Sequence, residues 1–157
     1  MRKSFVSIAL GACLALGLGS QTMYASAFNY SPDSVATTSI ENIGNDIVVT
    51  TEFSVYNNTR STYEKTASVS KTYKKGSETI AKIGISGTFQ YDGKTVKVKS
   101  KSVTPKTVYS GWSFSQDSFT SSGGKISLLG KLSNFWSSDV PVDILLSCDK
   151  NGNIDHN

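Results

Sequence analysis

Short runs in which apolar and polar residues alternate fill the chain from residue 47 onward. Alternation with a period of two is typical of a β-strand with one buried face, and no helical apolar spacing is sustained along the chain. The pattern predicts seven strands, at residues 47–56, 66–75, 79–91, 95–103, 112–118, 125–132 and 140–148. We therefore expect an all-β fold, a single antiparallel β-sandwich over residues 47–157, with a small barrel as the alternative.

The clearest turn in the pattern is Asp92-Gly93, which separates two alternating segments. Asp-Gly is a favoured pair for a type I′ turn, in which both central residues have positive φ, so we predict such a hairpin here. On its first arm Ile83, Ile85, Phe89 and Tyr91 share one face with Gly87, and we expect that face to be buried. Residues 74–77 and 121–124 predict two further hairpin connections.

The first 27 residues have the features of a secretory signal peptide. Arg2 and Lys3 precede the apolar run FVSIALGACLALGLG, and the segment ends in ASA, a cleavage signature of the A-x-A type. The apolar run is shorter than the roughly 20 residues that span a bilayer, which favours cleavage over a membrane anchor. We expect a protein secreted after cleavage near Ala27, with a partly ordered N-terminal arm at residues 28–46.

Removal of the predicted signal peptide leaves 130 residues, of which fourteen are basic and twelve acidic, a formal charge of +2. That length is typical of one domain, and so small a net charge points to no particular partner. Only Cys148 remains of the two cysteines, so the secreted chain has no internal disulfide. We expect core packing to stabilise the domain, and we expect no cofactor.

The C-terminal loop raises the question of a metal site, because oxygen-bearing side chains stand at alternate positions: Asp149, Asn151, Asn153 and Asp155. A calcium loop of the EF-hand type uses that spacing, but it also needs glycine at its sixth position and glutamate at its twelfth. Ile154 stands at the sixth position, and the sequence ends before the twelfth. We favour the other interpretation, that a buried strand over residues 140–148 ends here in a turn, and we predict no metal site.

Cys148 and His156 are the next candidates for reactive groups. A cysteine nucleophile needs a base within hydrogen-bond reach, and His156 is the only histidine in the chain. Alternation places Cys148 on the buried face of the last strand, whereas His156 lies beside the C-terminus, where we expect fraying. We therefore expect a buried, unreactive thiol, and a lone histidine argues against a catalytic triad or a zinc site.

The stretch GKTVKVKSKSVTPK carries the most distinctive charge, since residues 71–106 hold nine bases and two acids. Lys97, Lys99 and Lys101 alternate with other residues, and alternate residues of a strand project from one face about 7 Å apart. With Lys94, such a row predicts contact with an anionic cell-wall polymer or a membrane surface. The alternative is that lysines on an edge strand prevent aggregation.

Five aromatic residues are candidates for a carbohydrate-stacking platform: Tyr109, Trp112, Phe114, Phe135 and Trp136. Aromatic residues more often fill a sandwich core. Adjacent residues of a strand cannot both face inward, so we expect one member of the pair Phe135 and Trp136 to be exposed. We select Trp136 as the ligand-binding candidate.

Three stretches also support a resemblance: KTYKKGSETIAKIGISGTFQYDGK, the region from Trp112 to Gly124, and the ending LSCDKNGN. Over residues 66–153 the chain resembles a group of uncharacterised small secreted β-rich proteins of Gram-positive bacteria. The resemblance implies an extracellular β-rich domain with a bacterial exporter, and it implies no catalytic residues.

Together these observations predict a secreted, non-catalytic binding protein that acts at or near the bacterial cell surface. The candidate ligand-binding residues are Lys94, Lys97, Lys99, Lys101 and Trp136, the expected ligand is an anionic cell-wall polymer or a membrane surface, and no nucleic acid partner is expected. One alternative is a secreted antimicrobial or toxin-like protein that acts on membranes. A second is a small hydrolase with a carboxylate pair, one of which has a raised pKa.

Overall fold

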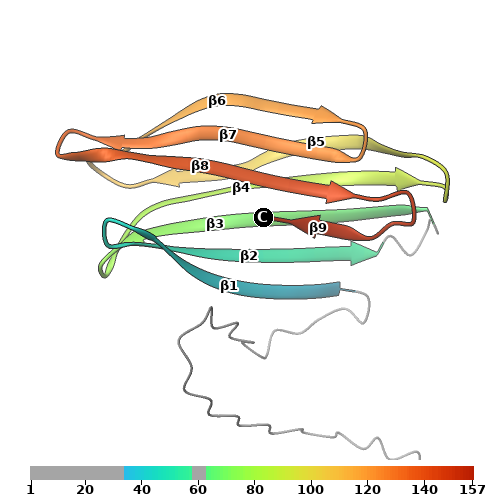
Figure 1. The fold of residues 1–157 in the computed structure, drawn as a ribbon, viewed down its shortest axis with the longest axis horizontal. Coiled ribbons are helices and arrows are strands. Elements are labelled where there is room, and N and C mark those ends of the chain that lie inside the picture. Colours follow the sequence, from blue (N-terminus) through green and yellow to red (C-terminus); the bar gives the residue numbers. More distant parts are fainter. Residues whose placement is uncertain (1–33, 58–62) are drawn as a thin grey trace, which may run out of the picture.

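The computed structural model describes residues 34–57 and 63–157, which form an all-β fold of two antiparallel sheets packed face to face (Figure 1). The first sheet contains β1 (Ser34–Gly44), β2 (Ile47–Asn57), β3 (Glu64–Lys75), β4 (Glu78–Tyr91) and β5 (Val96–Val108). The second contains β6 (Ser113–Ser122), β7 (Lys125–Asn134), β8 (Ser137–Cys148) and β9 (Ile154–His156). The sandwich is thus confirmed, and the small closed barrel does not form among the described residues. No helix in this part of the chain has the length and hydrophobicity to cross a bilayer.

Both sheets are simple meanders, because every strand pairs with its neighbour in the sequence. The turns therefore alternate between two ends of the sandwich. At left in Figure 1 lie the connections 45–46, 76–77, 109–112 and 135–136, which we call the Trp136 end. At right lie 92–95, 123–124 and 149–153, which we call the Gly152 end.

All seven predicted strands are present, with ends that differ from the prediction by a few residues. Two more strands, β1 and β9, raise the number from the expected seven to nine in the described residues. β1 occupies much of the segment expected to be an arm. It is the edge strand of its sheet, and most of its side chains are exposed, so it lacks the apolar alternation that marks the others. The predicted signal peptide and residues 28–33 lie outside the described residues.

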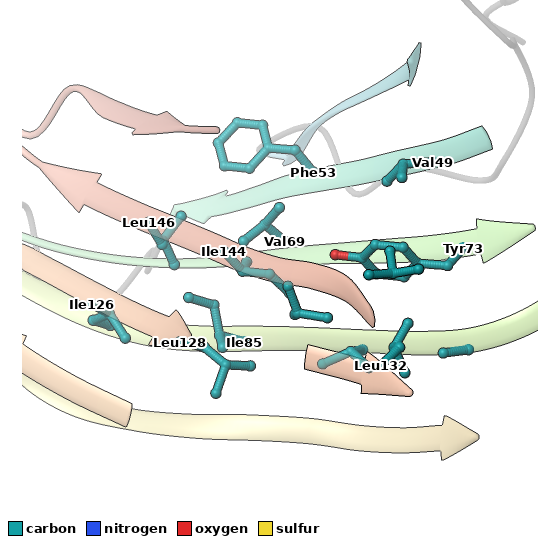
Figure 2. Close-up of a cluster of buried hydrophobic side chains, with 14 of the residues drawn as sticks. Val49, Phe53, Val69, Tyr73, Ile85, Ile126, Leu128, Leu132, Ile144 and Leu146 are labelled. Carbon is teal, nitrogen blue, oxygen red and sulfur yellow. The ribbon is translucent and has the colours of Figure 1, made fainter. Parts of the chain in front are cut away.

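The core lies between the inner faces of the two sheets (Figure 2). The predicted buried face of β4 is confirmed, since Ile83, Ile85 and Phe89 are fully buried. They face apolar residues of the second sheet, among them Leu128 of β7 and Ile144 of β8. Each fully buried side chain of this kind contributes roughly 1.5–3 kcal/mol, so the alternating pattern accounts for most of the stability.

The β4–β5 hairpin forms as predicted, but its turn type was wrong. Tyr91 pairs with Val96, which leaves a four-residue loop, and only Gly93 of the Asp92-Gly93 pair has positive φ. The Asp92 carboxylate accepts hydrogen bonds from the backbone N–H groups of Lys94 (2.8 Å) and Thr95 (2.6 Å), and this side-chain cap replaces the two-residue turn. Three consecutive positive φ values occur instead in the β1–β2 turn, at Gly44, Asn45 and Asp46, the last two being its central residues.

Candidate functional site

The predicted lysine row does not lie on one face of β5. Lys97 pairs with Gln90 on the outer face of the sheet, whereas Lys101 pairs with the buried Gly87 on the inner face. The reason is a register shift between Thr88 and Phe89, where β5 contributes one extra residue, Lys99. A bulge of this kind reverses the side-chain alternation beyond it, so the expectation of a single lysine face is corrected.

Two of the four candidate lysines are bound to other parts of the molecule. The Lys99 ammonium lies 2.6 Å from the Glu64 carboxylate, whose side chain is only 11% exposed. The Lys101 ammonium donates a hydrogen bond to the Phe119 carbonyl of β6 (3.0 Å) and lies 4.5 Å from the centre of the Phe119 ring. Both lysines thus connect strands of the sandwich, and their charges are partly satisfied.

Lys97 and Lys94 remain available for a ligand. Neither ammonium group has a hydrogen-bond or ion-pair partner within the described part of the chain, and both side chains are exposed. Lys97 lines a groove of about 320 Å³. The other lining residues are Tyr63, Gln90, Tyr91, Asp92 and Thr95.

Two tyrosines give this groove its aromatic wall. The rings of Tyr63 and Tyr91 meet edge to face with their centres 6.3 Å apart, and Tyr63 is 59% exposed. The Tyr91 backbone N–H also donates to the Tyr63 carbonyl (3.0 Å), which fixes one residue against the other. The groove therefore combines aromatic edges, amide and hydroxyl groups, an ammonium without a partner in the described residues, and the Asp92 carboxylate, which accepts hydrogen bonds from Lys94 and Thr95.

A structural corner supports the other side of Tyr91. Gly152, at φ +84, packs so closely on the Tyr91 ring that a Cβ atom there would lie 2.4 Å from a ring carbon. The Lys65 ammonium donates to the Gly152 carbonyl (2.7 Å) and lies 5.7 Å from the centre of the Tyr91 ring. The Gly93 N–H donates to the Lys150 carbonyl (2.8 Å). The sequence LSCDKNGN thus forms a corner that holds one wall of the groove in place.

The C-terminal loop is the turn that the sequence favoured. One oxygen of Asp149 accepts hydrogen bonds from the N–H groups of Asn151 (2.8 Å) and Asn153 (2.9 Å), and the other accepts from the Asn153 side chain (2.7 Å). These bonds, from Asn153 above all, lower the pKa of Asp149. Its carboxylate therefore closes its own loop. Among the described residues, no three His, Cys, Asp or Glu side chains come together in a way that could hold a metal ion.

Cys148 is buried, as predicted, and burial raises the pKa of its thiol, as does the nearby Asp149. Its Sγ lies 3.3 Å from the Asp149 carbonyl, to which it donates. His156 does not fray: it belongs to β9, and its ring centre lies 4.2 Å from that of Phe53. Packing of this ring against the first sheet orders the end of the chain, which the proximity of the C-terminus did not predict.

Trp136 lies at the opposite end of the sandwich from Lys94 and Lys97, in the β7–β8 turn. The structure therefore does not unite the predicted lysines and tryptophan in one site. Both rings of the adjacent pair are exposed, Phe135 at 87% and Trp136 at 88%. The rule of alternation predicted one exposed ring, but it applies to strands, and these two residues form the turn itself.

Carboxylates provide no obvious catalytic acid in the described residues. The hydrolase alternative requires a carboxyl group with a raised pKa. The three carboxylates with a displaced pKa all have it lowered by hydrogen-bond donors: Asp92, Asp139 and Asp149.

Sequence reasoning missed Tyr63, Tyr91 and Lys65 as parts of a site. Alternation placed Tyr91 on the inner face, where the rest of β4 is buried, but at the strand end its ring is only half-buried. Tyr63 and Lys65 come near it through pairing of β3 with β4. The turn at residues 74–77 predicted that hairpin, but no local pattern signalled its register, which shifts between Tyr73 and Lys74.

Comparisons with known proteins give no further guide: no family model, no curated protein and no solved structure matches this chain. The resemblance to small secreted Gram-positive proteins therefore stays a prediction.

Proposed function

We propose that the protein is a secreted, non-catalytic binding protein that attaches to an anionic polymer at the bacterial cell surface through the groove beside Lys97. The observation that supports this is the Lys97 ammonium in the wall of a tyrosine-lined groove, with Lys94 on the adjoining loop, both without a partner among residues 34–57 and 63–157. Ammonium groups attract phosphate or carboxylate groups, and the tyrosine rings and hydroxyls suit the sugar or polyol units between them.

The contacts of the candidate residues reduce the number that we propose to bind the polymer. Lys99 and Lys101 already have partners in the fold, so they contribute less to a ligand than Lys94 and Lys97. Trp136 belongs to the β7–β8 turn at the other end of the sandwich and does not line this groove. An exposed ion pair contributes roughly 0.2–1 kcal/mol, so two lysines give a modest affinity for one anionic group. A polymer that carries many such groups can raise the overall affinity through multivalent binding.

A pull-down on Gram-positive cell walls, with and without their anionic polymers, tests the proposal. The 28–157 protein contains the whole described sandwich. We expect Lys94→Gln with Lys97→Gln to weaken binding roughly tenfold at low salt, at about 0.7 kcal/mol per lost contact. Binding of the parent protein should fall as salt rises.

The matched control is Lys74→Gln with Lys75→Gln, which removes the same charge from exposed lysines of the β3–β4 turn region at the other end. Net charge alone predicts equal losses in the two double variants, and that result would contradict the proposal. Tyr63→Ala should also weaken binding, because it removes one aromatic wall without touching the charge.

A further inference from the structure

The β7–β8 turn presents two aromatic rings to solvent. Phe135 and Trp136 are 87% and 88% exposed, and they occupy the two positions between the paired residues Asn134 and Ser137. Hairpin turns usually carry Gly, Asn or Asp at such positions. No other large hydrophobic residue in the described part of the chain exceeds 59% exposure.

This tip is held in shape. The Asn134 side-chain oxygen accepts hydrogen bonds from the Trp136 backbone N–H (2.9 Å) and from the Ser137 hydroxyl (2.7 Å). The two rings contact each other nearly at right angles, with centres 4.8 Å apart. In the view of Figure 1 the β7–β8 turn extends beyond the other turns of the same end. The rings are thus displayed on a fixed projection.

Lysines stand beside the tip. A groove of about 260 Å³ is lined by Trp136, Lys75 and Asn45, so the β7–β8 tip adjoins the β1–β2 and β3–β4 turns. The Gly76 N–H donates to the Asp46 carbonyl (3.2 Å), which joins those two turns.

Apart from the Lys131–Asp139 ion pair, charges of both signs stand near the described turns of this end: Lys74, Lys75 and Lys106, and Glu41, Asp46 and Glu78. Two further apolar side chains lie at this end, Tyr109 at 45% and Ile43 at 40% exposure. The end therefore combines apolar rings with two exposed lysines, Lys74 and Lys75, whose ammonium groups have no partner in the described part of the chain.

We propose that the Trp136 end docks on the interface of an anionic phospholipid bilayer, with Phe135 and Trp136 inserted among the headgroups and the neighbouring lysines facing lipid phosphates. Tryptophan favours this zone because its ring is apolar and its N–H is polar. A lysine close to an anionic leaflet adds electrostatic attraction.

A protein partner fits less well, because a stable interface buries about 800 Å² on each side and this apolar surface is a narrow projection. A sugar in the neighbouring groove would use Trp136 alone, since Phe135 does not line it. The inference does not depend on the polymer groove, which lies at the other end of the molecule.

Sedimentation of the 28–157 protein with vesicles of phosphatidylglycerol and phosphatidylcholine tests the docking. We expect Phe135→Ala and Trp136→Ala each to lower the partition coefficient roughly tenfold, because each removes an inserted ring. Lys74→Gln with Lys75→Gln should lower it roughly threefold and reduce the preference for phosphatidylglycerol. Tyr56→Ala, which removes a 51% exposed ring near the end of β2 that lies away from the Trp136 end, is the control and should leave it unchanged.

Tryptophan fluorescence locates the inserted residue. The emission should shift to the blue on vesicle binding in the parent protein, and this shift should be absent in Trp136→Phe, which keeps only Trp112. The docking is overturned if the parent protein does not sediment with these vesicles, or if Phe135→Ala sediments as the parent does. It is also overturned if Trp136→Ala alone loses binding and free glucose, glucuronic acid or glucose 1-phosphate competes, since this outcome identifies the groove as a sugar site.

Discussion

The two ends of the sandwich differ in how their loops are hydrogen-bonded and in how their aromatic residues are packed. At the Gly152 end the loops are tied to one another and to the strands by backbone hydrogen bonds, from Gly93 to Lys150 (2.8 Å), Val98 to Gly123 (3.2 Å) and Cys148 to Gly124 (2.8 Å). At the Trp136 end the described residues show two such bonds, from Gly76 to Asp46 and from Tyr109 to Ile80 (3.2 Å each), and neither is as short as 2.8 Å.

Their aromatic residues differ accordingly. Tyr91 is covered on one side by the Gly152 backbone, with Lys65 holding that backbone in place. Phe135 and Trp136 have no such cover. An aromatic ring at a strand end therefore becomes part of the fold where backbone closes over it, and remains available for contact where it does not. Four predictions test this distinction.

Gly152→Ala should have the largest effect. A methyl group there would overlap the Tyr91 ring, and the φ of +84 is unfavourable for any residue with a side chain. Overpacking costs roughly 1–3 kcal/mol and the left-handed backbone roughly 1–2, so we expect a loss of about 3–4 kcal/mol in the free energy of unfolding. Urea denaturation measures it.

Gly76→Ala is the matched control at the Trp136 end. Gly76 also has positive φ (+58), but no atom lies within 4 Å of the position of its missing Cβ. Only the cost of the left-handed backbone applies, so we expect a loss of about 1 kcal/mol in the free energy of unfolding. Equal losses in the two variants would mean that the Gly152 corner is no more closely packed than an open turn.

Lys65→Met should have the next largest effect. It keeps the aliphatic part of the side chain but removes the hydrogen bond to the Gly152 carbonyl (2.7 Å) and the ammonium near Tyr91. A hydrogen bond from a charged group contributes roughly 1.5–3 kcal/mol, and partial exposure places the expected loss near the lower limit. Lys75→Met, at an exposed position without a partner in the described residues, should change stability by less than about 0.5 kcal/mol. Similar losses in the free energy of unfolding for Lys65→Met and Lys75→Met would mean that Lys65 does not stabilise the Gly152 corner.

Much of the fold was predictable, because a strand with one buried face leaves a pattern in the sequence. β4 shows this best, with Ile83, Ile85 and Phe89 all fully buried as expected. β1 left no such pattern, since an exposed edge strand needs only hydrogen bonds to β2. β9 has three residues, too few for a period to show.

The candidate site was less predictable, because it depends on pairing between strands. Lys99 is an extra residue only when β5 is compared with its partner β4. The residues of β5 alone therefore gave no sign of the bulge that puts Lys97 and Lys101 on opposite faces. The tyrosine groove likewise arises from the pairing of β3 with β4. Local reasoning predicted one exposed ring in the pair Phe135 and Trp136, but both are exposed, because the pair forms a turn to which the alternation of a strand does not apply.

Asp149 provides a pH test of the same corner. Its pKa is lowered in the folded protein by hydrogen bonds from Asn153 and Asn151, relative to the ordinary value of about 3.9 in an unfolded chain. A lowered pKa contributes stability above the unfolded value, and this contribution is lost as the pH falls through the folded value.

We therefore expect the melting temperature to fall below about pH 4, and to fall less steeply in Asp149→Asn. Asp92 and Asp139, whose pKa values are also lowered, continue to titrate in that variant, so some acid sensitivity remains. If the melting temperature falls equally at low pH in the parent protein and in Asp149→Asn, the stability of the loop does not depend on the Asp149 charge.

The smallest effect on stability is expected at the exposed tip. Phe135→Ser and Trp136→Ser should each change the free energy of unfolding by less than about 0.5 kcal/mol, because the rings bury little surface and contact mainly each other. Urea denaturation beside Gly152→Ala gives the comparison. A loss above about 1 kcal/mol would mean that the rings pack onto the sandwich in solution, and the two ends would then be alike. If stability is unchanged, folding gives no reason for two large rings at a turn where polar residues are usual, and the reason must lie in what the tip contacts.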